Sequence, residues 1–144
     1  MKIAVGSDMN APVPNAVVKN LLERGHEVDT FGALIKTPAM WSKVAIEVAG
    51  KVANGTYDQA VLFCWTGTGI SLAANKVKGI RAALCQDAQT AAGARQWNDA
   101  NVLCMSIRVV SEAVAEEILK AWFETAPSVD AEDVACLEYL AGKN

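Results

Sequence analysis

Two patterns of apolar and polar positions alternate along the chain. Nearly continuous apolar runs, typical of strands that are covered on both faces, alternate with stretches of helical period such as Val13, Ala16, Val17 and Leu21. The expected strands span residues 2–6, 26–32, 59–64, 79–85 and 101–106, of which 26–32 is edge-like. The expected helices lie near residues 13–24, 41–53, 69–76, 87–97, 111–124 and 129–141.

This order of elements predicts the fold class. Strands that alternate with helices, each strand apolar throughout, are typical of a parallel sheet with helices on both faces. The sequence therefore predicts an α/β protein, a three-layer α/β/α sandwich with a five-stranded parallel sheet. No internal linker interrupts the pattern, so residues 1–144 are expected to form one domain.

Composition and charge narrow the function classes. Hydrophobic residues make up 52% and charged residues 20% of the chain, and the net charge is -3. Such a chain has no basic surface to attract nucleic acid or anionic lipid. No apolar run approaches the ~18 residues of a membrane span. The apolar run near the N-terminus is too short for a signal peptide, so a cytoplasmic location is expected.

The four cysteines show neither a CxxC spacing nor a zinc pattern, so no metal site is predicted. Free thiols in a reducing compartment are the simplest interpretation. Cys85, Cys104 and Cys136 are expected to act as small buried apolar residues. Cys64 differs, because it stands at the tip of a strand.

In open parallel sheets, ligands bind beyond the carboxyl ends of the strands. After Cys64 comes a loop with Gly67 and Gly69, and a helix is expected to open near Ile70. The TGTG loop lacks the lysine spacing of a phosphate loop, and the first strand–helix turn has no GxGxxG, so nucleotide binding is not favoured. The other segments at this edge are Ser7–Met9, Gln86–Asp87 and Ser106–Arg108.

Three stretches resemble a known family. They are GSD at 6–8, CWTGTGISLAANKVKGIRAALC at 64–85 and NDANVL at 98–103. From residue 1 to about residue 124 the chain is similar, in register, to the ribose-5-phosphate isomerase B and galactose-6-phosphate isomerase family. The resemblance implies a Rossmann-like fold and a homodimer or tetramer with active sites between subunits. It also implies interconversion of aldose and ketose sugars, usually phosphorylated, without metal or organic cofactor.

Such an isomerisation needs a base and a group that holds the enediolate oxygen. A thiolate can be the base, and amide groups at a helix start can hold an oxyanion. By resemblance Cys64 is the base, although a cysteine buried at a strand end is the structural alternative. The resemblance places around the enediolate Thr66, Gly67, Gly69 and Ser71.

Three polar residues outside this loop have two interpretations each. By resemblance Asp8 contacts substrate hydroxyls, but an aspartate ahead of a helix can also be a helix cap or a turn residue. Asn98 by resemblance reaches the active site of the partner subunit, and the alternative is a helix C-cap. Asp99 is expected to be structural. The helix at about 129–141 is expected to pack on the partner subunit.

Aromatic and sulfur-containing residues replace typical family residues. Met9 and Trp97 stand where the family commonly has histidine, the second of which helps to open the sugar ring, and Trp65 replaces a glycine. If the alignment holds, Trp65 and Trp97 flank the sugar; packing at a subunit interface is the alternative. Trp41 and Trp122 are expected in the core or an interface, and His26, the only histidine, is expected to be structural.

The phosphate site also departs from the family. The family's C-terminal segment carries two arginines that clamp phosphate, whereas VDAEDVACLEYL has none and is acidic. Of the family's phosphate-binding cations, Arg108 remains; it can bind an anion or pair with Glu112 and Glu116, and both interpretations stay open. If other arginines, such as Arg81 or Arg95, reach the site, they could replace the missing phosphate clamps, and the argument against a phosphorylated substrate would weaken.

The sequence therefore predicts an aldose–ketose isomerase that uses no cofactor and acts on a small-molecule sugar. The expected substrate is not ribose 5-phosphate but an unphosphorylated sugar, a sugar acid or a sugar with its charge placed differently. Ring opening would then need another acid, for example a water held by Asp8, or else a substrate that does not cyclise well, such as a tetrose. The alternatives are a ribose-5-phosphate isomerase with an unusual phosphate site and a non-catalytic partner subunit.

Overall fold

The computed structural model describes residues 1–35 and 38–143, and strands and helices alternate along them. The strands are β1 (Lys2–Ser7), β2 (Glu27–Gly32), β3 (Gln59–Cys64), β4 (Ala82–Leu84) and β5 (Val102–Ser106). The helices are α1 (Pro12–Glu23), α2 (Trp41–Ala53), α3 (Thr68–Ala74), α4 (Ala88–Asn98), α5 (Glu112–Glu124) and α6 (Ala131–Ala141).

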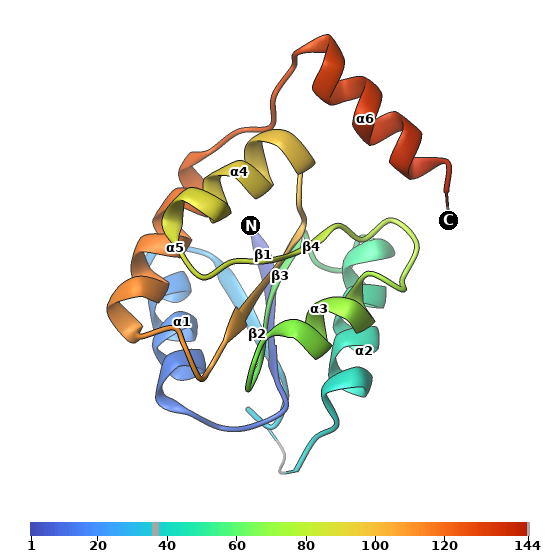
Figure 1. The fold of residues 1–144 in the computed structure, drawn as a ribbon. Coiled ribbons are helices and arrows are strands. Elements are labelled where there is room, and N and C mark those ends of the chain that lie inside the picture. The colour runs from blue at the N-terminus through green and yellow to red at the C-terminus, as the bar shows by residue number, and fades with distance from the viewer. Residues whose placement is uncertain (36–37, 144) are drawn as a thin grey trace.

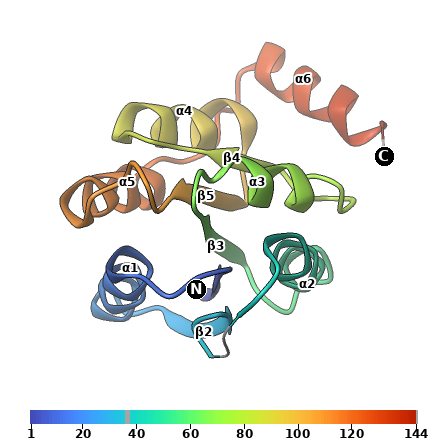
Figure 2. The ribbon, with the colours of Figure 1, turned by 60° about the horizontal axis from the view of Figure 1, so that its bottom comes forward.

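The five strands form one parallel sheet in the order β2-β1-β3-β5-β4, with β2 at an edge (Figure 1). Helices α1, α4 and α5 cover one face, and α2 and α3 cover the other (Figure 2). The predicted three-layer sandwich with a parallel sheet is therefore confirmed. We call the carboxyl ends of the strands, with the loops that follow, the carboxyl edge, and the opposite side the amino edge.

The central strand β3 is buried on both faces, which explains its continuous apolar sequence. Because side chains alternate along a strand, Val61 and Phe63 enter the core beneath α1, α4 and α5. Leu62 and Cys64 enter the core beneath α2 and α3. The sheet register thus turns Cys64 toward α3, the helix that follows its own loop.

Strand β4 is shorter than the predicted strand at residues 79–85. The side chain of Asn101 takes the place of the missing ladder: its Oδ1 accepts from the Arg81 N–H at 2.8 Å, and its amide donates to the Gly79 carbonyl at 3.0 Å. Pairing with β5 starts only at Ala82, opposite Val102. Hydrogen bonds from one side chain to a neighbouring segment cannot be inferred from the pattern of apolar positions, so the sequence predicts a longer strand.

Helix α6 projects from the body of the molecule at the amino edge (Figure 1). None of its residues is buried, and Val129 and Tyr139 are 90% and 71% exposed. Its connection to the body includes a hydrogen bond of 2.7 Å from the Ser128 N–H to the Gln96 carbonyl of α4. The expectation that Cys136 is buried is wrong, because in this chain α6 has no packed face. In the part of the chain that the structure describes, no helix combines the length and apolarity needed to cross a membrane.

Candidate active site

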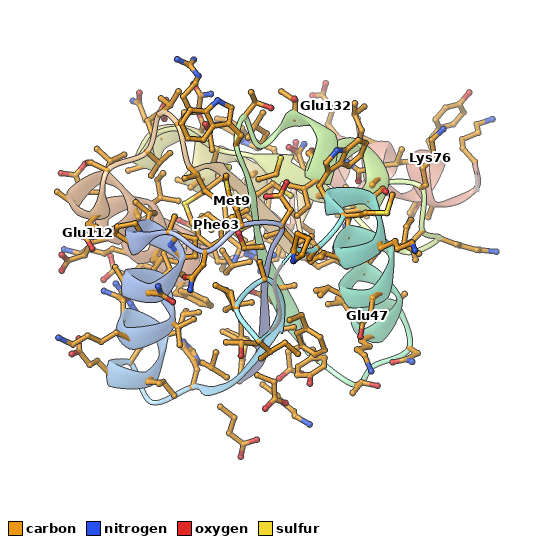
Figure 3. All side chains as sticks on the ribbon, turned by 90° about the horizontal axis from the view of Figure 1, so that it is seen from below. Met9, Glu47, Phe63, Lys76, Glu112 and Glu132 are labelled. Atoms are coloured by element: carbon orange, nitrogen blue, oxygen red, sulfur yellow. The ribbon has the colours of Figure 1, made fainter. Side chains whose placement is uncertain are left out.

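Three of the predicted ligand-binding segments meet at the carboxyl edge. The sheet register pairs Ser7 with Phe63 and Cys64 with Ser106, so β1, β3 and β5 end side by side. The Asp8 N–H donates to the Phe63 carbonyl at 3.4 Å. Viewed from below, Met9 and Phe63 lie near the centre of this edge, between α1 and α2 (Figure 3). The first and third strands therefore bring Asp8 next to the Cys64 loop.

Cys64 occupies a different environment from the two other cysteines in strands or at their ends. Cys85 and Cys104 lie fully inside the core, and burial raises the pKa of Cys85 to about 12 and raises that of Cys104 as well. Both therefore stay thiols near neutral pH, as expected of structural residues. Cys64 is 4% exposed and stands at the last position of β3, where the chain leaves the sheet. Of these three cysteines, Cys64 is therefore the one that has exposed surface at the carboxyl edge.

The loop after Cys64 depends on glycine. Gly67 is the N-cap of α3 and has a left-handed φ of 75°, which favours glycine. No side chain caps α3, so the amide groups of its first turn have no side-chain acceptor. The hydroxyls of Thr66 and Thr68 lie 2.8 Å apart. The loop thus offers amide and hydroxyl donors next to the thiol.

Two residues near this loop make contacts that the sequence did not indicate. The Ser71 hydroxyl lowers the pKa of the Cys104 thiol of the core and so opposes part of the rise that burial causes. Trp41, at the start of α2, lies on Gly69: a Cβ there would be 3.2 Å from the Trp41 Cδ2. Trp41 is 45% exposed, so it is not a core residue, which was one of the two roles expected for it, and it lies next to the loop after Cys64. Trp122 is buried, in agreement with the same expectation.

Asp8 has an unsatisfied acceptor. Its Oδ1 is buried and accepts no hydrogen bond from the described residues, and burial raises the pKa of this carboxyl. The structural alternative of a helix cap does not apply, because the N-cap of α1 is Ala11. An unpartnered carboxylate oxygen is costly, and a substrate hydroxyl would satisfy it.

Replacing Asp8 with asparagine is expected to separate stability from activity. Because the raised pKa means that the folded state binds the proton more tightly, the Asp8 contribution to stability falls as pH rises from about 4. At pH 7 the Asp8→Asn protein should be at least as stable as wild type, with a difference that shrinks toward pH 4. Loss of the charged acceptor should lower kcat/KM by about 10-fold. Urea unfolding at both pH values, beside kinetics, checks this; a less stable variant at pH 7 would contradict it.

Two buried serines hold the loops of the site. Ser7 and Ser106 are 0% exposed and are the buried polar residues in the described part of the chain. The Ser7 hydroxyl donates to the Met9 carbonyl at 2.6 Å, and the Ser106 hydroxyl donates to the Trp65 carbonyl at 2.8 Å. The sequence predicts both serines at strand ends but indicates no role for their hydroxyls. The feature of the sequence that could have indicated this role is a serine at the end of an otherwise apolar run.

Trp97 and Asn98 lie at the other edge of the sheet. They end α4, which leads through a short loop into the first residue of β5, Val102, at the amino edge. Within one chain, Trp65 and Trp97 therefore lie at opposite edges of the sheet, and the expectation that both flank one sugar stays a prediction for a site shared between two subunits. Helix geometry is the reason: α4 starts after β4 at the carboxyl edge and runs antiparallel to the strands.

The arginines also divide between the two edges. Arg108 is exposed at the carboxyl edge, donates its N–H to the Trp65 carbonyl at 2.9 Å, and forms no salt bridge with Glu112, Glu116 or another described residue. Arg81 and Arg95 instead bind the Asp99 carboxylate at the amino edge, at 3.4 and 3.1 Å. Within residues 1–35 and 38–143, no three His, Cys, Asp or Glu side chains are grouped to hold a metal ion.

Comparisons with known proteins agree with this architecture. Residues 3–135 match the family described as Ribose/Galactose Isomerase. Ribose-5-phosphate isomerase B of Escherichia coli is 42% identical over 122 residues, which cover 84% of this chain and 82% of that protein. The 4-deoxy-4-sulfo-D-erythrose isomerase of a Clostridium species is 31% identical over 127 residues, 87% of this chain and 80% of that one. The solved type B ribose 5-phosphate isomerase of Trypanosoma brucei superposes with a TM-score of 0.92 at 38% identity, covering 99% of this chain and 98% of that one.

Proposed function

The chain belongs to the ribose/galactose isomerase family and is an isomerase of that class; from this premise we propose that it interconverts an aldose and a ketose with Cys64 as the base. One observation carries the proposal. The central strand ends at the Cys64 thiol and leads into an uncapped helix start, and a backbone hydrogen bond from Asp8 to Phe63 brings the residue with the unpartnered Oδ1 to the same strand end. The thiol and the helix start supply the base and the oxyanion donors that moving a proton between adjacent carbons requires, and Asp8 adds an acceptor for a substrate hydroxyl.

In the proposed reaction, the Cys64 thiolate takes the proton from C2 of the open-chain aldose. The electron pair moves to form an enediolate, and the amide groups of Gly67 to Gly69 with the Thr66 hydroxyl hold its oxygen. The proton of the C2 hydroxyl then passes to the C1 oxygen, and the Cys64 thiol returns its proton to C1. The C1 oxygen thereby becomes a hydroxyl and the C2 oxygen becomes the carbonyl. Asp8 orients the substrate hydroxyls and holds the water that supplies the acid for ring opening.

The active site is proposed to be shared between two copies of the chain. Each copy carries Cys64 at one edge and Asn98 at the other, so Asn98 can serve only the site of a partner. Helix α6 supports this arrangement, because it has no buried residue and exposes Val129, Tyr139 and Leu140. A second copy packed on α6 would cover these side chains and bring one amino edge to the other carboxyl edge.

The proposed substrate is a sugar without the phosphate group of ribose 5-phosphate. Arg81 and Arg95 are bound to Asp99 and so do not supply the missing phosphate clamps. The first turn of α6 carries Glu132 and Asp133, which would repel a phosphate. The relative that is named as an isomerase of a sulfo-erythrose supports variation in both carbon number and terminal group. A free tetrose or a sugar with another polar end is therefore the first choice.

The Arg108→Ala variant tests this choice against a ribose-5-phosphate isomerase with an unusual phosphate site. If Arg108 holds a phosphate, its loss removes a charged hydrogen bond and should raise KM for the phosphorylated sugar by about 10- to 100-fold. For a neutral sugar we expect less than about 3-fold change, as for a surface substitution. Steady-state KM values of Arg108→Ala, beside those of the exposed Arg24→Ala as control, separate the two results. A large rise with phosphorylated sugars alone would contradict our substrate assignment.

The experiment that tests the function is solvent proton exchange in D₂O followed by NMR. The protein is incubated with tetroses, pentoses and hexoses, each free and phosphorylated, in parallel with a Cys64→Ala variant. Deuterium that enters beside the carbonyl of a free sugar only when Cys64 is present is the expected result. Exchange confined to ribose 5-phosphate would overturn the substrate, and exchange with no sugar would favour the non-catalytic partner subunit.

A further inference from the structure

An ion-pair cluster closes the end of α4 at the amino edge. We call it the Asp99 clamp and define it by Asp99, Arg81 and Arg95. Arg95 Nη1 lies 3.1 Å from Asp99 Oδ1, and Arg81 Nη2 lies 3.4 Å from Asp99 Oδ2, so one carboxylate holds two guanidinium groups. The Arg95 side chain is only 11% exposed and stacks on the Trp122 ring at 5.5 Å. The cluster is thus fixed in the body of the protein and is not a loose surface pair.

The backbone conformation of Asp99 indicates that this aspartate has a specific role. Asp99 has φ 41° and ψ 46°, and it is the non-glycine residue with positive φ in the described chain. This helix end favours glycine, or else asparagine. An aspartate at this position is strained, because its side chain disfavours a positive φ, but its carboxylate forms salt bridges with Arg81 and Arg95. Left-handed residues other than glycine are concentrated at functional sites, where their geometry is held by surrounding structure.

The clamp also fixes the chain on both sides of Asp99. Arg81 Nε donates to the Asp99 carbonyl at 2.8 Å, and Arg95 donates to the Ala100 carbonyl. The Ala100 N–H returns to the Ala94 carbonyl at 3.0 Å, which closes the last turn of α4. Residues at the start of β4, the end of α4 and the start of β5 are therefore joined. Asn98 is the residue that directly precedes Asp99, at the last position of α4.

Asn98 itself is exposed, and within the described residues its side chain makes no hydrogen bond. Its position therefore comes from the backbone that the clamp holds. Resting on the proposed shared site, we propose that Asp99 is a positioning residue that acts across the subunit interface: it holds Asn98 where it enters the partner's carboxyl edge. A lesion at Asp99 then damages the site that contains the partner's Cys64 and spares the site of its own Cys64.

Two variants test the proposal. Asp99→Gly keeps the left-handed backbone free of strain but removes the carboxylate, and Asp99→Asn keeps one acceptor oxygen at a residue type that tolerates this backbone. Misplacement of a binding group by about 1 Å can cost about 100-fold in rate. We expect kcat/KM to fall by about 10- to 100-fold in Asp99→Gly and by less in Asp99→Asn, with the melting temperature measured for both.

Subunit mixing supplies the readout that a merely structural role does not give. A Cys64→Ala protein and an Asp99→Gly protein are unfolded, mixed in equal amounts and refolded. Each hybrid dimer then has one site with both lesions and one with neither, so random pairing should restore about a quarter of wild-type activity. A matched mixture of Cys64→Ala with Asn98→Ala should recover to the same extent.

The outcomes separate the two proposals. If Asn98→Ala is complemented but neither Asp99 variant is, the Asp99 clamp serves general stability or its own site, and this inference is overturned while the shared site stands. If Asn98→Ala is not complemented either, the shared site fails and takes this inference with it. Should Asp99→Gly not refold, Asp99→Asn with Cys64→Ala gives the same comparison.

Discussion

Replacement of Cys64 with serine is expected to lower kcat by about 10³-fold and to leave the fold intact, because general-base catalysis contributes on that order. A hydroxyl has nearly the shape of a thiol but does not ionise near neutral pH, so the variant has no base at this position. The strand end that carries Cys64 is packed by Leu62 and Ile70, and a serine fits there without a cavity. Steady-state kinetics with the sugar found by solvent exchange, together with thermal unfolding, measures both effects.

The matched control is Cys85→Ala. Cys85 is fully buried, and the pKa of its thiol is raised to about 12, so it has no role as a base. Removing its sulfur should lower the free energy of unfolding by about 1 kcal/mol through a small cavity, with kcat within about 3-fold of wild type. A Cys64→Ser enzyme that kept a tenth of wild-type activity or more would show that another group is the base.

The position of Cys64 was predictable because it depends on local pattern and one topological rule. The apolar runs and helical periods gave the bounds of α2 and β3 as the structure has them, at 41–53 and 59–64. Continuous apolar strands then required a parallel sheet, and parallel strands collect their following loops at one edge. This rule alone predicts that Ser7–Met9 and Ser106–Arg108 lie at the same edge as Cys64.

What the sequence did not show depends on side chains that meet across the fold. Asn101 replaces a strand ladder, Trp41 lies on Gly69, and Asp99 joins Arg81 to Arg95. Such contacts have no period along the chain. The exposure of Cys136 was missed for a related reason, because an apolar face on α6 looks the same whether its cover is in this chain or in another.

The second large effect is expected for Gly67→Ala. At φ 75° an alanine is strained by about 1–2 kcal/mol. Its Cβ would also lie 2.5 Å from Leu84 Cδ1 and 3.0 Å from the Met105 backbone carbon. The leucine can rotate away, but Met105 belongs to the buried strand β5 and cannot. We expect the free energy of unfolding to fall by about 2–4 kcal/mol and kcat/KM to fall by about 100-fold or more, because the loop that presents the amide donors must move.

Gly55→Ala separates these two causes. Gly55 has nearly the same backbone, with φ 83°, but a Cβ there would meet nothing within 4 Å, and it lies in the turn before β3 at the amino edge. This variant should show the backbone cost of about 1–2 kcal/mol alone, with unchanged kcat/KM. Urea unfolding and steady-state kinetics are measured for both variants. The difference between their losses in the free energy of unfolding gives the cost of the contacts at Gly67 without the backbone strain. If both lost the same stability and neither lost activity, Gly67 would be an ordinary turn residue, and the amide groups beside Cys64 would not hold the enediolate.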